Sequence, residues 1–289
     1  MKIAVIGIGA VGSVIARELK KLNHNTTLFG KSIKEGFTIL ENDQKTYYPY
    51  QILDLHEYEG SSFDIIFVAT KATALEALSP HISKMCHKNT EIILCENGMG
   101  FDHFFHNPIP AVVYISGQKH DHMIHHFQDA RLLVEDKSYI YLATLIEDLE
   151  RSVDAELIIE RSNDFLRHRY EKLLINLGIN SVTALAKNTA KIFDLDTIIH
   201  LTRSLLEEGL AIINHDEQII EPAFIDTALS IYASYDRDMG TSMFYDATSG
   251  TRTEYEFIQK YLHGQKGNLE TPVLDIVVTL LEAYQYERQ

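Results

Sequence analysis

The chain has 289 residues, of which 45% are hydrophobic and 23% are charged, so it is long enough to bury the cores of two domains. Its formal net charge of −15 disfavours a nucleic-acid partner and attachment to anionic membranes. The two cysteines are too few for a disulfide framework, and no window of about 18 apolar residues predicts a membrane span. The first strand-like run begins at once, without the basic segment of a signal peptide, so we expect a cytoplasmic location.

The first part of the chain alternates between strand-like and helix-like segments. Short runs rich in β-branched residues predict strands at residues 2–6, 26–29, 64–69, 91–94 and 111–115. Helical spacing of apolar residues predicts helices at residues 11–22 and 72–83. Strands that alternate with helices are typical of a parallel sheet with helices on both faces, so the expected fold is a Rossmann-type doubly wound α/β sheet.

After about residue 160 the pattern becomes helical. Long segments with helical spacing of apolar residues lie at residues 163–177, 195–213, 222–232 and 272–286. We therefore expect a dinucleotide-binding Rossmann domain over residues 1–160 and an all-α helical domain over residues 161–289. Residues 117–160 show no clear pattern, and we predict no secondary structure for them.

A glycine-rich loop follows the first predicted strand. Its GxGxxG pattern consists of Gly7, Ile8, Gly9, Ala10, Val11 and Gly12. Gly7 permits a tight turn and Gly9 lets the backbone approach a pyrophosphate, which would lie at the N-terminus of the next helix. Gly12 allows that helix to pack closely on the strand. The alternative is an ordinary glycine-rich turn, but the strand–loop–helix context favours dinucleotide binding.

The segment after the second predicted strand favours NADPH over NADH. NAD-binding domains usually carry an Asp or Glu about 20 residues after the glycine loop, where it binds the ribose hydroxyls. This chain has Lys31, Ser32 and Lys34 instead, a set suited to a 2′-phosphate. The alternative is a solvated loop with ordinary lysines.

A polar stripe interrupts an apolar helical segment in the second half of the chain. Lys172, Asn176 and Asn180 are four residues apart, so they share one face of a helix. Asparagine is unfavourable inside helices because its side chain competes for backbone hydrogen bonds. Two asparagines on this face therefore indicate a polar cleft. The alternative is the solvent face of an amphipathic helix, although such a face usually carries Glu, Lys and Arg.

Several motifs, in order along nearly the whole chain, resemble those of the ketopantoate reductases. The matching sequences are GIGAVG at the N-terminus, Lys71 after DIIFVAT, Asn97-Gly98-Met99-Gly100, KLLINLGINSVTAL, Thr241-Ser242-Met243 and Arg252-Thr253-Glu254. The Lys172, Asn176 and Asn180 set and the Ser242 and Glu254 pair are more specific to that family than the glycine loop is.

The resemblance implies an NADPH-dependent reduction of 2-dehydropantoate (ketopantoate) to (R)-pantoate, a step in pantothenate and coenzyme A biosynthesis. It implies that Lys172 is the general acid and that Glu254 orients the substrate and this lysine. Hydride delivery to a ketone builds negative charge on its oxygen, and a lysine supplies both positive charge and a proton there.

The resemblance also implies binding roles for the remaining motif residues. Asn97 would lie near the nicotinamide and the substrate, and Lys71 on the cofactor side. Asn176, Asn180 and Ser242 would hydrogen-bond the hydroxyl and carboxylate of the substrate. The family more often has an arginine at the position of Lys31, and a lysine keeps the charge but loses the bidentate fork, so NADPH preference would be weaker.

Two other functions stay open at this point. One is a related reductase or dehydrogenase that acts on a different 2-keto or 2-hydroxy acid, because such families share folds. The other is a non-catalytic NADPH-binding regulator, which we would expect to lack Lys172 or Glu254. The sequence does not decide the oligomeric state, and a homodimer through the helical domain is compatible with it.

Histidines are dense in one short segment. His120, His122, His125 and His126 surround Asp121, a composition that suits zinc or nickel. Hydride transfer to a ketone needs no metal, so we expect none, and we interpret the segment as a solvated turn or an edge strand.

Overall fold

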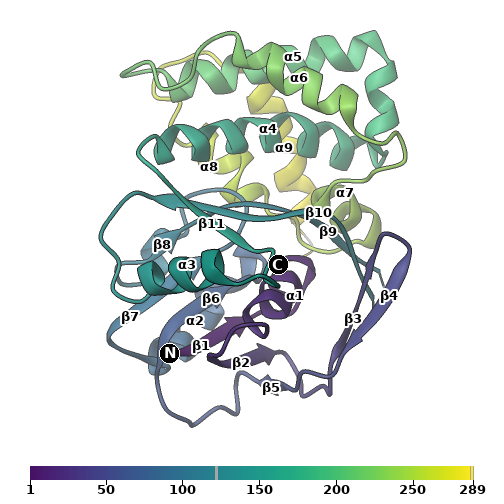
Figure 1. Cartoon of the computed structure of the whole chain (residues 1–289). Coiled ribbons are helices and arrows are strands. Elements are labelled where there is room, and N and C mark those ends of the chain that lie inside the picture. The colour runs from purple at the N-terminus through teal and green to yellow at the C-terminus, as the bar shows by residue number, and fades with distance from the viewer. Residues whose placement is uncertain (121–122, 287, 289) are drawn as a thin grey trace. The chain divides into compact units, whose positions relative to one another are not determined.

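The computed structural model describes residues 1–120, 123–286 and 288. They divide into two compact units, each described here by itself (Figure 1). The N-terminal unit comprises Met1–Glu96 and Phe101–Phe165, and the C-terminal unit comprises Asn97–Gly100 and Leu166–Gln289. The short loop at residues 97–100 thus packs with the second unit although the first unit surrounds it in the sequence.

A parallel sheet forms the centre of the N-terminal unit. Its strands are β1 (Lys2–Ile6), β2 (Asn25–Gly30), β5 (Ile52–Asp54), β6 (Phe63–Val68), β7 (Cys86–Leu94) and β8 (Ile109–Pro110). They lie in the order β5-β2-β1-β6-β7-β8, and every neighbouring pair is parallel. The Rossmann-type sheet expected from the sequence is confirmed.

Burial explains why the strands of this sheet read as continuous apolar runs. On β1, Ile3 and Val5 point to one face and pack with Val14 of the helix α1 (Ala10–Leu19). Ala4 and Ile6 point to the other face and are also fully buried. A strand with both faces covered cannot alternate apolar and polar residues, as is usual for parallel sheets.

A second sheet packs on the other side of α1, so that α1 lies between the two sheets. Its strands are β3 (Phe37–Glu41), β4 (Gln44–Tyr48), β9 (Val112–His120), β10 (Met123–Glu135) and β11 (Ile158–Ser162). The order is β11-β10-β3-β4, and β9 pairs with β10. Helix α1 contacts both β1 and β2 of the first sheet and β9 and β10 of the second. Only the start of β9 was predicted from the sequence.

Four further helical elements complete this unit. They are η1 (Ala72–Ala74), α2 (Leu75–Lys84), η2 (Asp102–Phe104) and α3 (Leu142–Arg151). Leu145 and Leu149 of α3 are buried in the same core as α1. At the start of α3, the carboxylate of Glu91 accepts hydrogen bonds from the backbone N–H groups of Tyr141 and Leu142, at 3.1 and 2.6 Å.

The expectation of a solvated turn or edge strand for the histidine-rich segment is wrong for His126. This residue lies on β10, which has β9 on one side and β3 and β11 on the other. It is 6% exposed, and its ring hydrogen-bonds the carboxylate of Glu41 and the carbonyl of Asp129. His122 and Asp121 lie outside the described residues. Among the described residues, no group of three or more His, Cys, Asp and Glu side chains is arranged to hold a metal ion.

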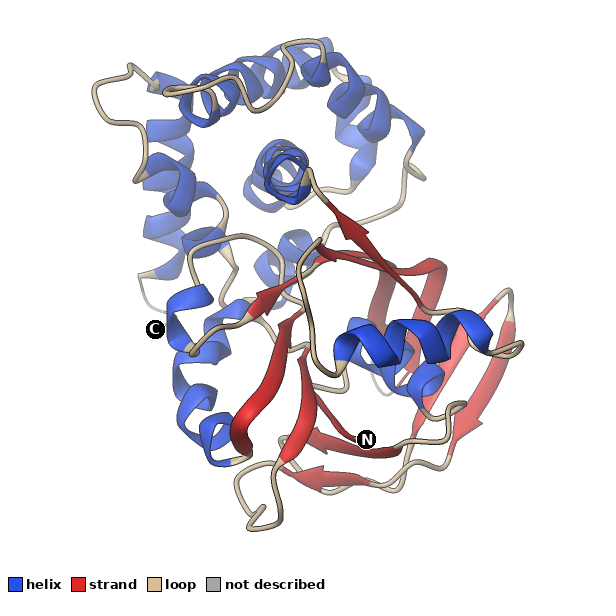
Figure 2. Ribbon diagram, turned by 60° about the vertical axis from the view of Figure 1, so that its left-hand side comes forward, coloured by secondary structure: helices blue, strands red, loops and turns tan. Residues whose placement is uncertain are grey.

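The C-terminal unit is helical, as expected. Its elements are α4 (Phe165–Ala186), η3 (Ala190–Asp194), α5 (Asp196–Ile213), α6 (Phe224–Ser234), α7 (Ser242–Ser249), η4 (Tyr255–Phe257), α8 (Gln259–His263) and α9 (Pro272–Gln285). Figure 2 views α4 nearly end-on, with other helices around it. A central helix of this kind is apolar on most of its faces.

Two glycines allow the helices around α4 to approach closely. A Cβ atom on Gly178 would lie 2.5 Å from the hydroxyl oxygen of Tyr232, which donates a hydrogen bond to the carbonyl of Ile175 at 2.8 Å. Burial raises the pKa of Tyr232. A Cβ on Gly209 of α5 would lie 2.5 Å from a methyl carbon of Leu177. These contacts fix the position of α4, which carries the polar stripe.

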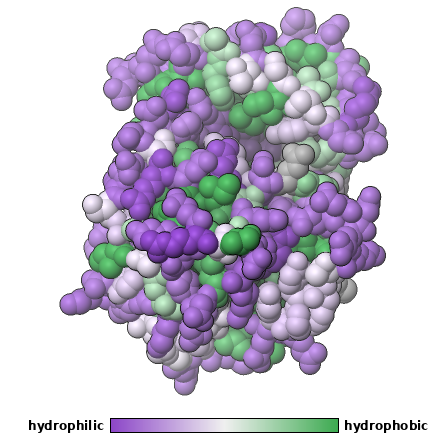
Figure 3. Space-filling model, viewed as in Figure 1, coloured by the Kyte–Doolittle hydropathy of each residue, from purple (hydrophilic) through white to green (hydrophobic). Residues whose placement is uncertain are grey.

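The surface is mostly hydrophilic on the face shown in Figure 3, with hydrophobic residues scattered over it. Within the described part of the chain, no helix combines the length and the apolar character that crossing a membrane requires.

Candidate functional site

The glycine loop after β1 has the geometry of a phosphate-binding turn. Gly7 has a φ of +92°, and a Cβ on it would lie 2.7 Å from the carbonyl oxygen of Ala69. A Cβ on Gly12 would lie 2.0 Å from the carbonyl oxygen of Gly7. Both positions therefore require glycine for the loop to fold.

Gly9 differs from the other two glycines. It is the N-cap of α1, and its carbonyl accepts a hydrogen bond from the N–H of Ser13 at 3.0 Å. A Cβ on Gly9 would have nothing within 4 Å. The space in front of this helix N-terminus is thus open to a ligand, and free N–H groups there favour an anion. Because β1 lies between β2 and β6, the loop sits where the strand order reverses, the usual dinucleotide position.

Lysines follow the two strands that flank β1. Lys31 comes directly after β2, Lys71 lies three residues after the end of β6, and both are exposed. Ser32 and Lys34 are exposed in the same loop as Lys31.

Lys119 on β9 adds a positive charge that the sequence analysis did not single out. Burial lowers the pKa of Lys119, and the charge of Lys34 lowers it further. The two ammonium groups therefore lie within electrostatic reach of each other. No sequence signal predicted that Lys119 lies near Lys34, because their proximity depends on the place of β9 in the second sheet.

In the C-terminal unit, the polar stripe of α4 is half-buried at its start and buried at its end. Lys172 and Asn176 are half-buried, and Asn180 is 4% exposed. The side-chain nitrogen of Asn176 is buried and has no hydrogen-bond partner within the described parts of the chain. A buried donor without an acceptor costs about 1–3 kcal/mol, and a ligand oxygen would satisfy it. This arrangement suits a polar binding cleft.

Ser242 is the first residue of α7. The preceding Thr241 is the N-cap, and its side-chain oxygen accepts a hydrogen bond from the N–H of Phe244 at 3.1 Å. Gly250 ends the helix in the left-handed conformation, with a φ of +73°. Ser242 itself is exposed. The N-cap of Thr241 fixes the backbone position of Ser242 at the start of α7.

Glu254 precedes η4 and is 5% exposed. The side chain of Gln285 on α9 holds the backbone of the residue before it. The N–H of Thr253 donates to Oε1 of Gln285 at 3.0 Å, and Nε2 of Gln285 donates to the carbonyl of Thr253 at 3.4 Å. No sequence signal pointed to Gln285, because 32 residues separate it from Thr253.

The loop that carries Asn97 packs against the segment after Glu254. The N–H of Met99 donates to the carbonyl of Phe257 at 2.8 Å. Gly98 has a φ of +94°, and a Cβ on it would lie 2.3 Å from the same carbonyl oxygen. Asn97 and Glu254 therefore belong to neighbouring segments of one unit.

Two hydrogen bonds join the end of α4 to α7 and α8. The hydroxyls of Thr183 and Thr241 lie 2.8 Å apart, and Nε2 of Gln259 donates to the hydroxyl of Ser181 at 2.9 Å. Asn180 and Ser242 consequently lie in neighbouring segments. The C-terminal unit thus holds Asn97, Lys172, Asn176, Asn180, Ser242 and Glu254, while residues 7–12, Lys31 and Lys71 belong to the N-terminal unit.

Comparison with known proteins identifies the family of this fold and site. The family model described as ketopantoate reductase PanE/ApbA matches residues 3–138, and the model of its C-terminal part matches residues 164–285. The chain belongs to the ketopantoate reductase family. It is an oxidoreductase of this pyridine-nucleotide-dependent family, and the resemblance seen in its motifs is confirmed.

Individual relatives match over nearly their full length. A 2-dehydropantoate 2-reductase of Mycobacterium tuberculosis is 24% identical over 292 residues, which cover 97% of each chain. The solved structure of a dimeric ketopantoate reductase from Staphylococcus aureus superposes with a TM-score of 0.90 at 34% identity, covering 99% of each chain. A D-mandelate dehydrogenase solved with NADH and anilino(oxo)acetate has a TM-score of 0.85, covering 99% of each chain, and at 19% identity it shows a shared fold only.

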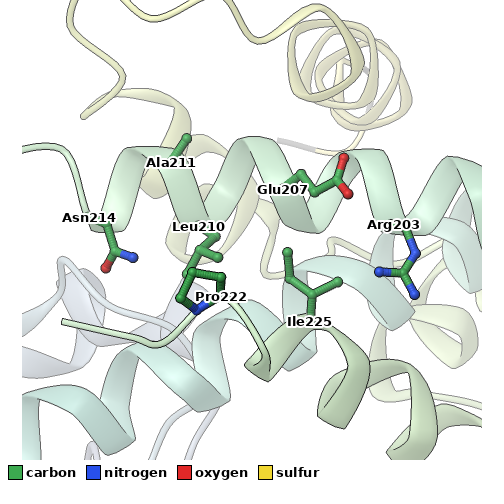
Figure 4. Close-up of a pocket in the computed structure, with 7 residues that line it drawn as sticks. All are labelled: Arg203, Glu207, Leu210, Ala211, Asn214, Pro222 and Ile225. Atoms are coloured by element: carbon green, nitrogen blue, oxygen red, sulfur yellow. The ribbon is translucent and has the colours of Figure 1, made fainter. Parts of the chain in front are cut away.

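A hollow of about 430 Å³ lies elsewhere on the ketopantoate reductase fold, between α5 and α6 (Figure 4). Two of its polar residues, Arg203 and Asn214, already have partners within the protein. Arg203 donates to Asp226 at 2.7 Å, and the amide of Asn214 bonds the backbone of Ile219 and Ile220. None of the candidate site residues lines this hollow, so we do not assign the reaction to it.

Proposed function

We propose that this protein reduces 2-dehydropantoate to (R)-pantoate with NADPH, as a step in pantothenate and coenzyme A biosynthesis. Membership of the ketopantoate reductase family and the named relative from Mycobacterium tuberculosis support this proposal. The observation that carries it is the stripe of half-buried Lys172 and Asn176 and buried Asn180, because it combines a cation with an unsatisfied amide donor. A keto acid bearing a hydroxyl offers acceptors to both.

In this proposal Lys172 donates the proton to the carbonyl oxygen of the substrate. The oxygen gains negative charge as the carbonyl carbon is reduced, so a positioned ammonium stabilises it and then protonates it. Glu254 would orient the lysine and the substrate. The burial of Glu254 would restrict the motion of its carboxylate. The hydrogen bonds of Gln285 to Thr253, the preceding residue, would restrict it further.

The amide and hydroxyl side chains would bind the rest of the substrate. Asn176, Asn180 and Ser242 would hydrogen-bond its carboxylate and hydroxyl groups, and Asn97 would contact both substrate and nicotinamide. If these donors are left unpaired by an analogue that lacks the hydroxyl, discrimination against that analogue is strong.

We propose that residues 1–160 bind NADPH and that residues 161–289 bind and protonate the substrate. The cofactor, when bound, supplies the hydride. The open space at Gly9 and the helix N-terminus fit its pyrophosphate, and Lys31 fits its 2′-phosphate. Lys71 would line the cofactor site. No metal enters this proposal.

The proposed substrate is tested with a panel of keto acids. We would follow NADPH oxidation with ketopantoate, with 2-ketoisovalerate, which lacks the hydroxyl, and with benzoylformate, the keto acid of mandelate. The proposal expects a kcat/KM for ketopantoate at least about 100-fold above the other two. Preference for benzoylformate would instead favour a 2-hydroxy acid dehydrogenase, whose fold this chain shares. Cofactor binding without turnover on any of them would favour a regulator.

We further propose a homodimer, because the similar Staphylococcus aureus enzyme is described as dimeric. Light scattering coupled to size-exclusion chromatography would measure the mass in solution. A mass near 33.0 kDa, that of one chain, would contradict the dimer.

A further inference from the structure

Two buried threonines join the helix that carries Asn180 to the helix that begins with Ser242. Thr183 on α4 is 0% exposed and Thr241 before α7 is 8% exposed. Their hydroxyl oxygens lie 2.8 Å apart, although 58 residues separate them in the sequence. Both belong to the C-terminal unit.

The neighbouring hydrogen bonds indicate the direction of this contact. The hydroxyl of Thr183 donates its single proton to the carbonyl of Ile179 at 2.7 Å, so it accepts from Thr241. Thr241 therefore donates to Thr183 while it accepts from the N–H of Phe244 at 3.1 Å. A chain of three hydrogen bonds runs from the first turn of α7 to the backbone of α4, and such chains strengthen each of their members.

We propose that Thr183 and Thr241 are positioning residues, which hold Ser242 in register with Asn180 so that both can bind the carboxylate and hydroxyl of the substrate. The chain of hydrogen bonds ends at the carbonyl of Ile179, which directly precedes Asn180 in the sequence. Thr241 directly precedes Ser242. A shift of either backbone would thus move a binding side chain. This inference rests on the proposed function for the substrate, but the hydrogen-bond chain itself does not.

Removal of the Thr183 hydroxyl tests the chain while keeping the shape of the side chain. In Thr183→Val, the proton of Thr241 loses its acceptor in a buried place, so Thr241 must turn or shift, and its bond to the Phe244 amide weakens. Thr183→Ser keeps the hydroxyl and is expected to restore the wild-type behaviour. Thr202→Val is the matched control, because Thr202 on α5 is 0% exposed and its hydroxyl has no hydrogen-bond partner within the described residues.

The kinetic readout separates positioning from general damage. For Thr183→Val we expect the KM for ketopantoate to rise about tenfold, the KM for NADPH to stay at its wild-type value, and the preference for ketopantoate over 2-ketoisovalerate to fall. Thr183→Ser and Thr202→Val should match the wild type. A folded Thr183→Val enzyme with the wild-type KM and substrate preference would overturn the proposal.

Amide hydrogen exchange at Phe244 gives a readout that needs no activity. We expect exchange about five- to tenfold faster in Thr183→Val than in the wild type or Thr202→Val, although Thr183 does not contact this amide. If the wild type does not reduce ketopantoate, the proposed function fails. Unchanged exchange at Phe244 would overturn the role of the hydrogen-bond chain whatever the substrate is. If Thr183→Val does not fold, Thr183→Val/Thr241→Val leaves no hydroxyl unpaired, and a wild-type KM in that double variant would contradict the proposal.

Discussion

At the scale of single residues, the three glycines of the phosphate loop have different roles. Gly7 and Gly12 are required by the fold, because a Cβ would lie 2.7 and 2.0 Å from backbone oxygens. Gly9 is not, because a Cβ there would meet nothing within 4 Å. We therefore predict that Gly9→Ala keeps the wild-type Tm but weakens NADPH binding at least about tenfold, since the methyl group occupies the space of the pyrophosphate.

Gly12→Ala is the matched comparison for this prediction. It should lower the Tm by several degrees, because strain of more than about 1 kcal/mol shifts the Tm of a small domain that far. Thermal unfolding and NADPH fluorescence titration would measure both effects. A Gly9→Ala variant that unfolds like Gly12→Ala, or that binds NADPH normally, would contradict this assignment of roles.

Lys31 is predicted to select the cofactor. A charge-assisted hydrogen bond to a phosphate contributes about 1.5–3 kcal/mol, so Lys31→Ala should raise the Kd for NADPH about tenfold or more and leave the Kd for NADH unchanged. Lys45→Ala serves as the control, since Lys45 is an exposed lysine of β4 in the same unit. Equal losses for NADPH and NADH would show that Lys31 does not contact the 2′-phosphate.

At the scale of elements, the sequence predicted those with a clear period and missed those with a broken one. β1 was predicted to its residue, and α4 was predicted too short, because Ser181 and Thr183 interrupt the apolar pattern although both are buried. β10 was missed because its register shifts twice near Gln128, where Asp129 adopts a φ of +56°. Such bulges break the alternation on which strand prediction depends.

The clamp between α9 and the segment before Glu254 leads to a prediction at this scale. Gln285→Met removes both hydrogen bonds to the buried backbone of Thr253, so it should lower the free energy of unfolding by about 1–3 kcal/mol and also lower kcat. Gln218→Met should cost less than about 0.5 kcal/mol, because Gln218 is exposed and its side chain donates to Glu221 at the surface. Urea unfolding of both variants would measure the difference, and equal stabilities would refute the clamp.

At the scale of the whole molecule, half-buried and paired carboxylates make stability depend on pH. Burial opposes the charge of Glu41, but its hydrogen bond to His126 and the charge of Arg17 outweigh burial and lower its pKa. The pKa of Asp64 is also lowered: burial opposes this, and the N–H of Lys2 at 2.7 Å and the ring of His87 outweigh it.

A lowered pKa in the folded state means that these carboxylates stabilise the fold above their unfolded pKa of about 4. This contribution is lost as the pH falls from about 5 through the lowered folded values. We predict that the Tm falls over this range and that Glu41→Gln shows a shallower fall, because it removes one of the titrating groups. Glu35→Gln, at an exposed position, should follow the wild type. Parallel curves for Glu41→Gln and the wild type would contradict the prediction.

The candidate site itself was predictable from motifs, but its supports were not. The helical spacing of Lys172, Asn176 and Asn180 makes them candidates in the sequence. Thr183, Thr241 and Gln285 instead make contacts between segments far apart in the sequence. Only the fold shows which of the many threonines and glutamines are buried against the backbone that carries a binding residue. The sequence therefore indicates candidate residues, and the structure shows the contacts made by the segments that carry them.

In the proposed reaction, Lys172 protonates ketopantoate during its reduction by NADPH. The most direct measurement is the rate of NADPH oxidation with ketopantoate for the wild type, Lys172→Ala and Lys191→Ala, the last being a control at an exposed lysine of the same unit. The account predicts that kcat falls at least about 100-fold in Lys172→Ala, the usual effect of losing a general acid, and stays unchanged in Lys191→Ala. A Lys172→Ala enzyme that binds NADPH and turns over ketopantoate at the wild-type rate would contradict it.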